Sequence, residues 1–112
     1  MRTETDVGTD AHATVDQMRI EFGFEEAERP RVIDLFRRLD RQLKRFSADA
    51  VDMELTVKDR DTHDQKVTME VRLPNLPRIV ATSKETSLRD ALMDVREDVW
   101  RQIKEVSDRR RG

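Results

Sequence analysis

Residues 51–73 have the sequence VDMELTVKDRDTHDQKVTMEVRL, and this stretch decides the fold. Apolar side chains occupy every second position over residues 51–57 and again over residues 67–73. Such alternation is typical of β-strands that bury one face and expose the other. The polar residues 59–65 between the two runs are few enough for a hairpin connection. The stretch therefore predicts two antiparallel strands with one shared apolar face.

The chain before this hairpin predicts one strand and one helix. Apolar residues alternate with polar ones over residues 18–24, which favours a first strand. Pro30 suits the first turn of a helix, where its missing N–H costs nothing, and apolar residues then follow at spacings of three and four. That apolar stripe comprises Val32, Leu35, Phe36, Leu39, Leu43 and Phe46.

The chain after the hairpin predicts a fourth strand and a long final helix. Pro74 and Pro77 end the third strand, and residues 78–83 form a strand too short to decide which positions face inward. Ser87 is a suitable N-cap, and an apolar stripe continues at helical spacing over residues 88–106. The element order is βαβββα, an α+β fold in which a four-stranded sheet carries both helices packed on one face.

Length and composition bound the domain organisation. A chain of 112 residues has room for one hydrophobic core. Residues 15–107 are expected to form a single domain, preceded by a flexible segment over residues 1–14 that lacks apolar periodicity. Residues 108–112 contain a run of arginines and form a basic tail. Since no apolar run is long enough to span a membrane and no secretory signal precedes the domain, a cytoplasmic protein is expected.

Residue types needed for catalysis or metal binding are scarce. The chain has no cysteine, two histidines and three glycines, which leaves no thiolate ligands and no glycine-rich phosphate loop. Neither histidine has a nucleophile that the sequence places beside it. The acidic run that starts at Asp59 differs from a calcium loop, because Asp64 stands where that loop requires glycine. We therefore expect no enzymatic activity, no metal, no cofactor and no small-molecule substrate.

Charge is distributed unevenly, although the net charge is only −2. Residues 1–28 include two basic and eight acidic residues, whereas residues 31–46 include six basic and two acidic ones. Helical spacing places most of these cations on one exposed face, whose length suits the phosphates of a few nucleotides. A helix that is merely solvated is the alternative, although such helices usually mix both signs. The cations of this segment are Arg31, Arg37, Arg38, Arg41, Lys44 and Arg45.

The final helix has a more mixed surface. Glu97 and Arg101 are four residues apart, in the favourable orientation for an ion pair within the helix. Trp100 lies one position off the apolar stripe. It therefore either covers the edge of the core or stacks on a base or on a partner's side chain.

The last strand and helix, together with the end of the first helix, resemble a known family. The resemblance rests on IVATSK at residues 79–84, aliphatic positions within residues 88–99, WRQIK at residues 100–104 and LKRF at residues 43–46. These features are similar to those of the ribosome hibernation-promoting factors and ribosome-associated translation inhibitors, over roughly residues 16–106.

This resemblance implies a βαβββα domain that binds the small ribosomal subunit between its head and body, in the channel used by mRNA and tRNA anticodons. It implies a stress factor that represses translation without catalysis and that contacts ribosomal RNA through basic residues of both helices. Carried over by position, the rRNA-binding residues are Arg37, Arg38, Arg41, Lys44, Arg45, Lys84, Arg101 and Lys104.

The sequence also departs from the family pattern. Asp98 stands where the family usually has lysine, and Glu97 and Glu105 reduce the positive charge further, so weaker binding to rRNA is expected. The chain resembles the short form of the family, which lacks the second domain that pairs ribosomes. The alternative is a divergent member that acts as a protein-interaction or regulatory module without binding the ribosome. The oligomeric state is not predicted.

Overall fold

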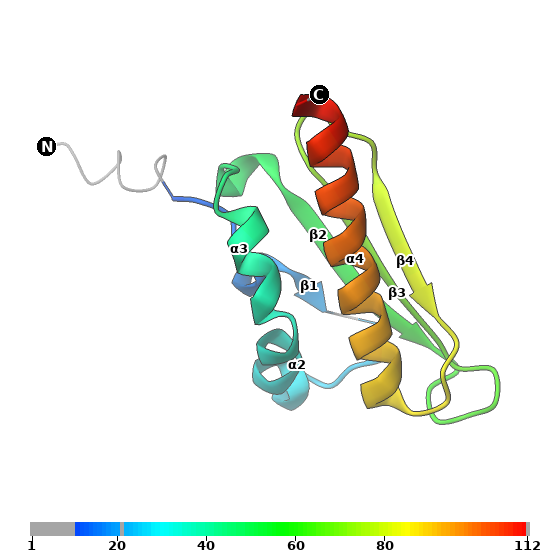
Figure 1. Ribbon diagram of the computed structural model, residues 1–112. Coiled ribbons are helices and arrows are strands. Elements are labelled where there is room, and N and C mark those ends of the chain that lie inside the picture. The colour runs from blue at the N-terminus through cyan, green and yellow to red at the C-terminus, as the bar shows by residue number, and fades with distance from the viewer. Residues whose placement is uncertain (1–10, 21, 112) are drawn as a thin grey trace, which may run out of the picture.

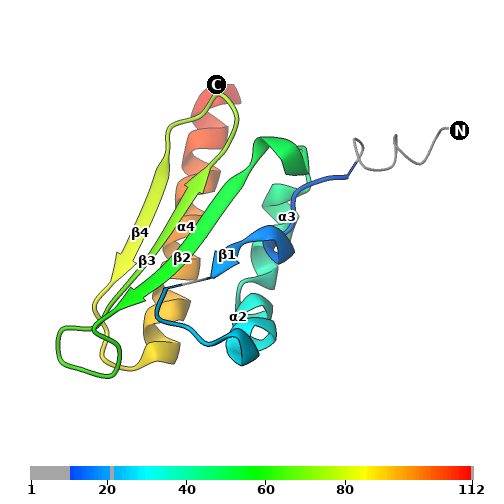
Figure 2. The same ribbon diagram turned by 180° about the vertical axis from the view of Figure 1, so that it is seen from behind.

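A four-stranded mixed sheet, covered on one face by helices, forms the body of the molecule (Figure 1). The computed structural model describes residues 11–20 and 22–111. The strands lie in the order β1-β2-β3-β4, and the predicted α+β class with helices packed on the sheet is confirmed. Figure 2 shows the opposite face of the sheet, with the helices behind it. The strands are β1 (Arg19–Ile20), β2 (Asp52–Lys58), β3 (Lys66–Arg72) and β4 (Ile79–Ser83), and the helices are α2 (Arg29–Leu35), α3 (Asp40–Leu43) and α4 (Leu88–Arg111).

The central hairpin has the predicted antiparallel pairing. Strands β2 and β3 pair along their whole length, from Asp52 opposite Arg72 to Lys58 opposite Lys66. Strand β4 pairs antiparallel with β3. Its alternate residues Ile79, Ala81 and Ser83 are buried, while Val80 and Thr82 are exposed. The structure thereby decides the inward-facing positions that the short run left open.

Strand β1 is much shorter than the predicted strand over residues 18–24. Among the described residues Arg19–Ile20 pair with β2 in parallel, and the carbonyl of Phe22 still accepts from the N–H of Val57 at 3.1 Å, but the Phe22 side chain is 64% exposed. The cause is Gly23, which bends the chain with φ of +88°. A Cβ there would lie 2.3 Å from the carbonyl oxygen of Val57, so only glycine permits this close approach.

The first helix is broken where the sequence predicts continuity. Helix α2 ends at Leu35, a tight turn spans Arg37–Leu39, and α3 follows. In this turn the N–H of Leu39 donates to the carbonyl of Phe36 at 2.9 Å, a three-residue spacing that is tighter than an α-helix. The tighter turn keeps the apolar stripe facing the sheet. As a result, Phe36, Leu39 and Leu43 are all fully buried.

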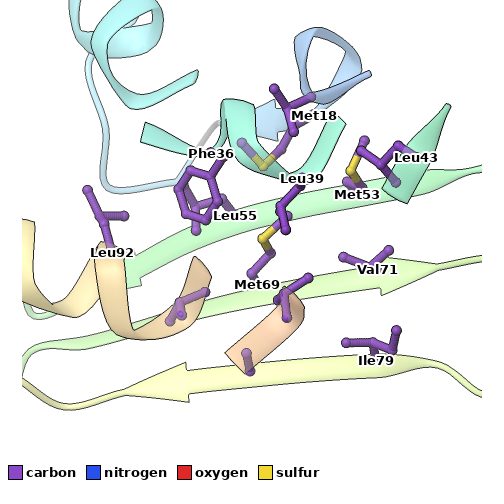
Figure 3. Close-up of a cluster of buried hydrophobic side chains, with 14 of the residues drawn as sticks. Met18, Phe36, Leu39, Leu43, Met53, Leu55, Met69, Val71, Ile79 and Leu92 are labelled. Carbon is purple, nitrogen blue, oxygen red and sulfur yellow. The ribbon is translucent and has the colours of Figure 1, made fainter. Parts of the chain in front are cut away.

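The hydrophobic core lies between the helices and the apolar face of the sheet (Figure 3). Phe36 and Leu39 lie over Leu55 and Met69 of the central strands. Val99 of α4 is also fully buried, within the stripe that the sequence predicts for the final helix. The start of that helix matches its prediction too, since the Ser87 hydroxyl accepts from the N–H of Asp90 at 3.3 Å.

Both ends of the described chain are more ordered than predicted. The expected flexible segment is wrong for residues 11–14: Ala13 is fully buried, its N–H donates to the carbonyl of Phe46 at 2.9 Å, and His12 forms a β-bridge with Ser47. Residues 1–10 lie outside the described residues. At the other end, α4 continues through Arg111, so most of the predicted basic tail is helical. Among the described residues, no helix combines the length and apolar character needed to cross a bilayer.

An ion pair ties the start of α2 to the hairpin loop. The Glu28 carboxylate accepts two hydrogen bonds from the Arg60 guanidinium, at 2.8 and 2.6 Å, and one from the N–H of Glu25 at 2.8 Å. The hydrogen bonds from Arg60 are the main cause, followed by that from Glu25, of a Glu28 pKa lowered to about 2. The folded state therefore prefers this carboxylate ionised.

Replacing Glu28 by glutamine is expected to reduce the sensitivity of the fold to acid. A depressed pKa stabilises the fold above the ordinary value of 4.5, and this contribution is lost as the pH falls towards 2. The decrease in Tm between pH 5 and pH 2, followed by circular dichroism, should therefore be smaller for Glu28→Gln than for the wild type. An equal decrease in both proteins would contradict this role of the Glu28–Arg60 pair.

Candidate nucleic-acid interface

Helices α3 and α4 lie side by side and run in the same direction (Figure 1). The Gln42 side chain donates to the carbonyl of Trp100 at 2.9 Å, and one turn later Arg45 donates to the Ser107 hydroxyl at 3.0 Å. We call the exposed line between residues 38–45 and residues 96–107 the helix seam. The seam is the place where cations from the two helices meet.

The first helical segment supplies three arginines to the candidate interface. Arg38, Arg41 and Arg45 are spaced by three and four residues, so they share one face of the helical segment. Arg41 is exposed and has no ion-pair partner within the described part of the chain. Arg45 is exposed, and its guanidinium lies 5.7 Å from the centre of the Phe46 ring. Lys104 contributes an exposed ammonium from α4, 3.4 Å from the carboxylate of Asp108.

Arg38 is held by an aromatic ring and a carboxylate of α4. Its guanidinium lies 4.2 Å from the centre of the Trp100 ring and donates to both oxygens of Glu97, at 2.9 and 3.1 Å. Arg96 donates to the same carboxylate at 2.8 Å. Glu97 therefore lies between two guanidinium groups, in the way that a bound phosphate would.

Electrostatics keep the Glu97 carboxylate ionised. Desolvation raises its pKa, but the hydrogen bond from Arg96 and the charges of Arg38 and Arg96 outweigh this, so the pKa is lowered. The predicted pair between Glu97 and Arg101 is wrong. Glu97 faces the seam, and Arg101 pairs with Asp98 instead.

Trp100 is partly buried against the core, as the first of its two interpretations expects. The Arg38 guanidinium lies over the Trp100 ring, so the two side chains pack together as one unit. The sequence pattern does not predict that Gln42 is buried beside this unit. Among the described residues its Oε1 has no hydrogen-bond partner.

The structure does not bring Arg37 to the seam. Its guanidinium forms a bidentate pair with Asp16, at 2.8 and 3.0 Å, and a further contact with Asp40 at 3.2 Å. The hydrogen bond from Arg37 is the main cause of a lowered Asp16 pKa. These carboxylates offset the charge of Arg37, so it adds little to an anion-binding surface.

Lys44, Arg101 and Lys84 also lie away from the seam. Lys44 is exposed one turn after Asp40, and within the described residues its side chain makes no hydrogen bond or ion pair to α4. Arg101 is paired with Asp98, whose neighbour Gln102 donates to the edge strand at the carbonyl of Val80. Lys84 precedes α4 and is separated from Lys104 by about 24 Å of helix, at ~1.5 Å per residue. The seam thus gathers Arg38, Arg41, Arg45 and Lys104 of the predicted binding residues.

This arrangement favours binding of an extended polyanion by charge and hydrogen bonding. Guanidinium groups match the geometry of phosphate oxygens, and their spacing along a helix follows a nucleic-acid strand. Within the described residues there is no group of three histidine, aspartate or glutamate side chains that would hold a metal ion, the acidic hairpin loop included. No family model matches this sequence, and no curated protein matches it.

Proposed function

We propose that this protein is a non-catalytic factor that binds the small ribosomal subunit and represses translation. The helix seam lies against rRNA phosphates in the channel used by mRNA and tRNA. The observation that carries this proposal is that Arg38 and Arg45 both reach α4, at Glu97 and at Ser107, with Arg41 between them on the first helical segment. The structure also has the βαβββα order that the family resemblance implies, and this order supports the proposal.

The alternative is a regulatory module that binds protein and does not bind the ribosome. The carboxylates that engage Arg37, Arg38 and Arg101 favour it, because they neutralise cations that an RNA-binding protein would offer to phosphate. The two proposals differ in whether the seam carries enough free charge. Arg41 and Arg45, which lack carboxylate partners within the described chain, favour RNA binding.

Competition for the channel tests the proposed site on the subunit. Small subunits are loaded with mRNA and initiator tRNA before the protein is added, and bound protein is measured after pelleting. Occupied subunits should retain far less protein than empty ones, and the protein should repress translation of a reporter mRNA in a purified system. Equal retention on both kinds of subunit would place any binding outside the channel and contradict the proposal.

Replacing Glu97 by glutamine is expected to strengthen binding to small subunits about fivefold. The change removes the internal carboxylate that competes with phosphate for Arg38 and Arg96. A factor of about five corresponds to ~1 kcal/mol, the interaction of two unit charges 4 Å apart in water. The dissociation constant measured by fluorescence anisotropy of labelled protein checks this. Asp64→Asn is the matched control, because it removes the same charge from an exposed position in the hairpin loop, away from the seam. Equal effects of the two variants would contradict a local competition at the seam.

A further inference from the structure

A second surface, an apolar hollow of about 260 Å³, lies between α2 and the first turns of α4. Its apolar lining comes from Val32 and Leu35 on one helix and from Leu88 and Leu92 on the other. Leu35 and Leu88 are only partly buried, so the hollow keeps aliphatic surface open to solvent. Covering that surface would be favourable in proportion to its area.

Two arginines lie at the rim of the hollow. Arg31 and Arg89 are exposed, and neither side chain forms a hydrogen bond or ion pair among the described residues; the charge of Arg31 acts at longer range on the Glu28 carboxylate. The one carboxylate of the lining, Glu28, is already engaged by Arg60 and by the N–H of Glu25. The rim therefore attracts a ligand with negative charge on both sides of an apolar group.

The size and chemistry of the hollow favour a peptide over a nucleotide or a small molecule. Small-molecule sites measure roughly 300–1,000 Å³, so this hollow suits one or two aliphatic side chains. Nucleobases are held by aromatic stacking and by hydrogen bonds to their edges, and the lining offers no aromatic ring. Aliphatic side chains seated in such a hollow, with charge pairs at its rim, are the usual arrangement of a protein interface.

We propose that this hollow, the α2–α4 hollow, binds a partner polypeptide that inserts leucine-sized side chains between Arg31 and Arg89, which pair with flanking carboxylates. The site is separate from the seam, because Arg96 donates to the carbonyl of Leu35 at 3.2 Å and closes the space between the two helices there. Binding at the hollow does not depend on the proposed ribosomal function. The protein thus has one surface for a polyanion and another for an acidic, aliphatic peptide.

An NMR titration of the full chain tests this proposal. The probe is a blocked peptide of two leucines with two aspartates on each side, and the amide shifts of Val32, Leu35, Leu88 and Leu92 should move. Replacing the leucines of the peptide by serine should abolish the shifts. Arg89→Glu and Arg31→Glu should each weaken binding at least about tenfold, whereas Arg109→Glu, the same change at the far end of α4, should not.

Four results would overturn the proposal. The serine peptide could bind as well as the leucine peptide, which would reduce the effect to charge attraction. Arg109→Glu could weaken binding as much as Arg89→Glu, or the peptide could shift the amides of the seam alone. An oligouridylate that shifts the amides of the hollow where the peptide does not would assign the site to nucleic acid. Spectral dispersion of each variant shows that it is folded, and two separate rim variants guard against a local defect in either one.

Discussion

Replacing both Arg41 and Arg45 by glutamate is expected to lower the affinity for small ribosomal subunits about 100-fold. Each reversal turns an attraction to phosphate into a repulsion, with a loss of about tenfold for each charge near the backbone of a nucleic acid. Both side chains are exposed and have no carboxylate partner in the described chain, so their charge is free to act on a ligand. The dissociation constant from anisotropy titration of labelled protein at fixed salt measures the effect.

The matched control reverses two cations on the opposite face of the molecule. Lys58 and Lys66 lie opposite each other at the end of the central hairpin and are exposed. Lys58→Glu with Lys66→Glu changes the net charge by the same amount, yet the affinity should change only slightly. If the two double variants lost affinity equally, binding would depend on overall charge, and the seam would lose its assigned role.

Replacing Phe36 by alanine is expected to reduce the free energy of unfolding by about 3–5 kcal/mol, the usual cost of a large buried aromatic ring. Phe36 is fully buried where α2 gives way to the tight turn, and its ring lies over Leu55 of the central strand (Figure 3). A cavity there would loosen the helical segment from the sheet. Urea unfolding followed by circular dichroism measures the loss.

Phe22→Ala is the control for this variant, because the same ring is removed from a side chain that is 64% exposed. Its effect should stay within about 0.5 kcal/mol, as for other surface substitutions. A loss at Phe36 no larger than that at Phe22 would mean that the ring does not anchor the first helix.

Strict periodicity made much of the fold predictable. The β2–β3 hairpin and α4 carry unbroken patterns of two and of three to four residues, and each formed as predicted. The first strand carried the same pattern, but Gly23 bends it, because close packing on Val57 outweighs the local preference. The break after Leu35 was not predictable either, since a tight turn preserves the apolar stripe that indicates a helix.

The candidate site was predictable in part. The spacing of Arg38, Arg41 and Arg45 indicates a cationic face, and the structure brings Arg38 and Arg45 into contact with α4 and leaves Arg41 exposed between them. Which cations are neutralised depends on contacts between distant segments, such as Arg37 with Asp16 and Arg38 with Glu97. A single sequence shows pairs within one helix, which is why the spacing predicts a pair between Glu97 and Arg101. Pairing across elements requires the fold.

The most direct test of the seam as an rRNA-binding surface is cosedimentation with purified small subunits over a series of salt concentrations. Each phosphate neutralised contributes about −0.7 to −0.9 to the slope of log K against log salt. We expect the wild type to pellet at low salt and its log K to fall steeply with log salt. The double variant Arg41→Glu, Arg45→Glu should pellet weakly, with a slope shallower by about 1.5. Failure of the wild type to pellet at any salt, or identical slopes for both proteins, would contradict the proposed function.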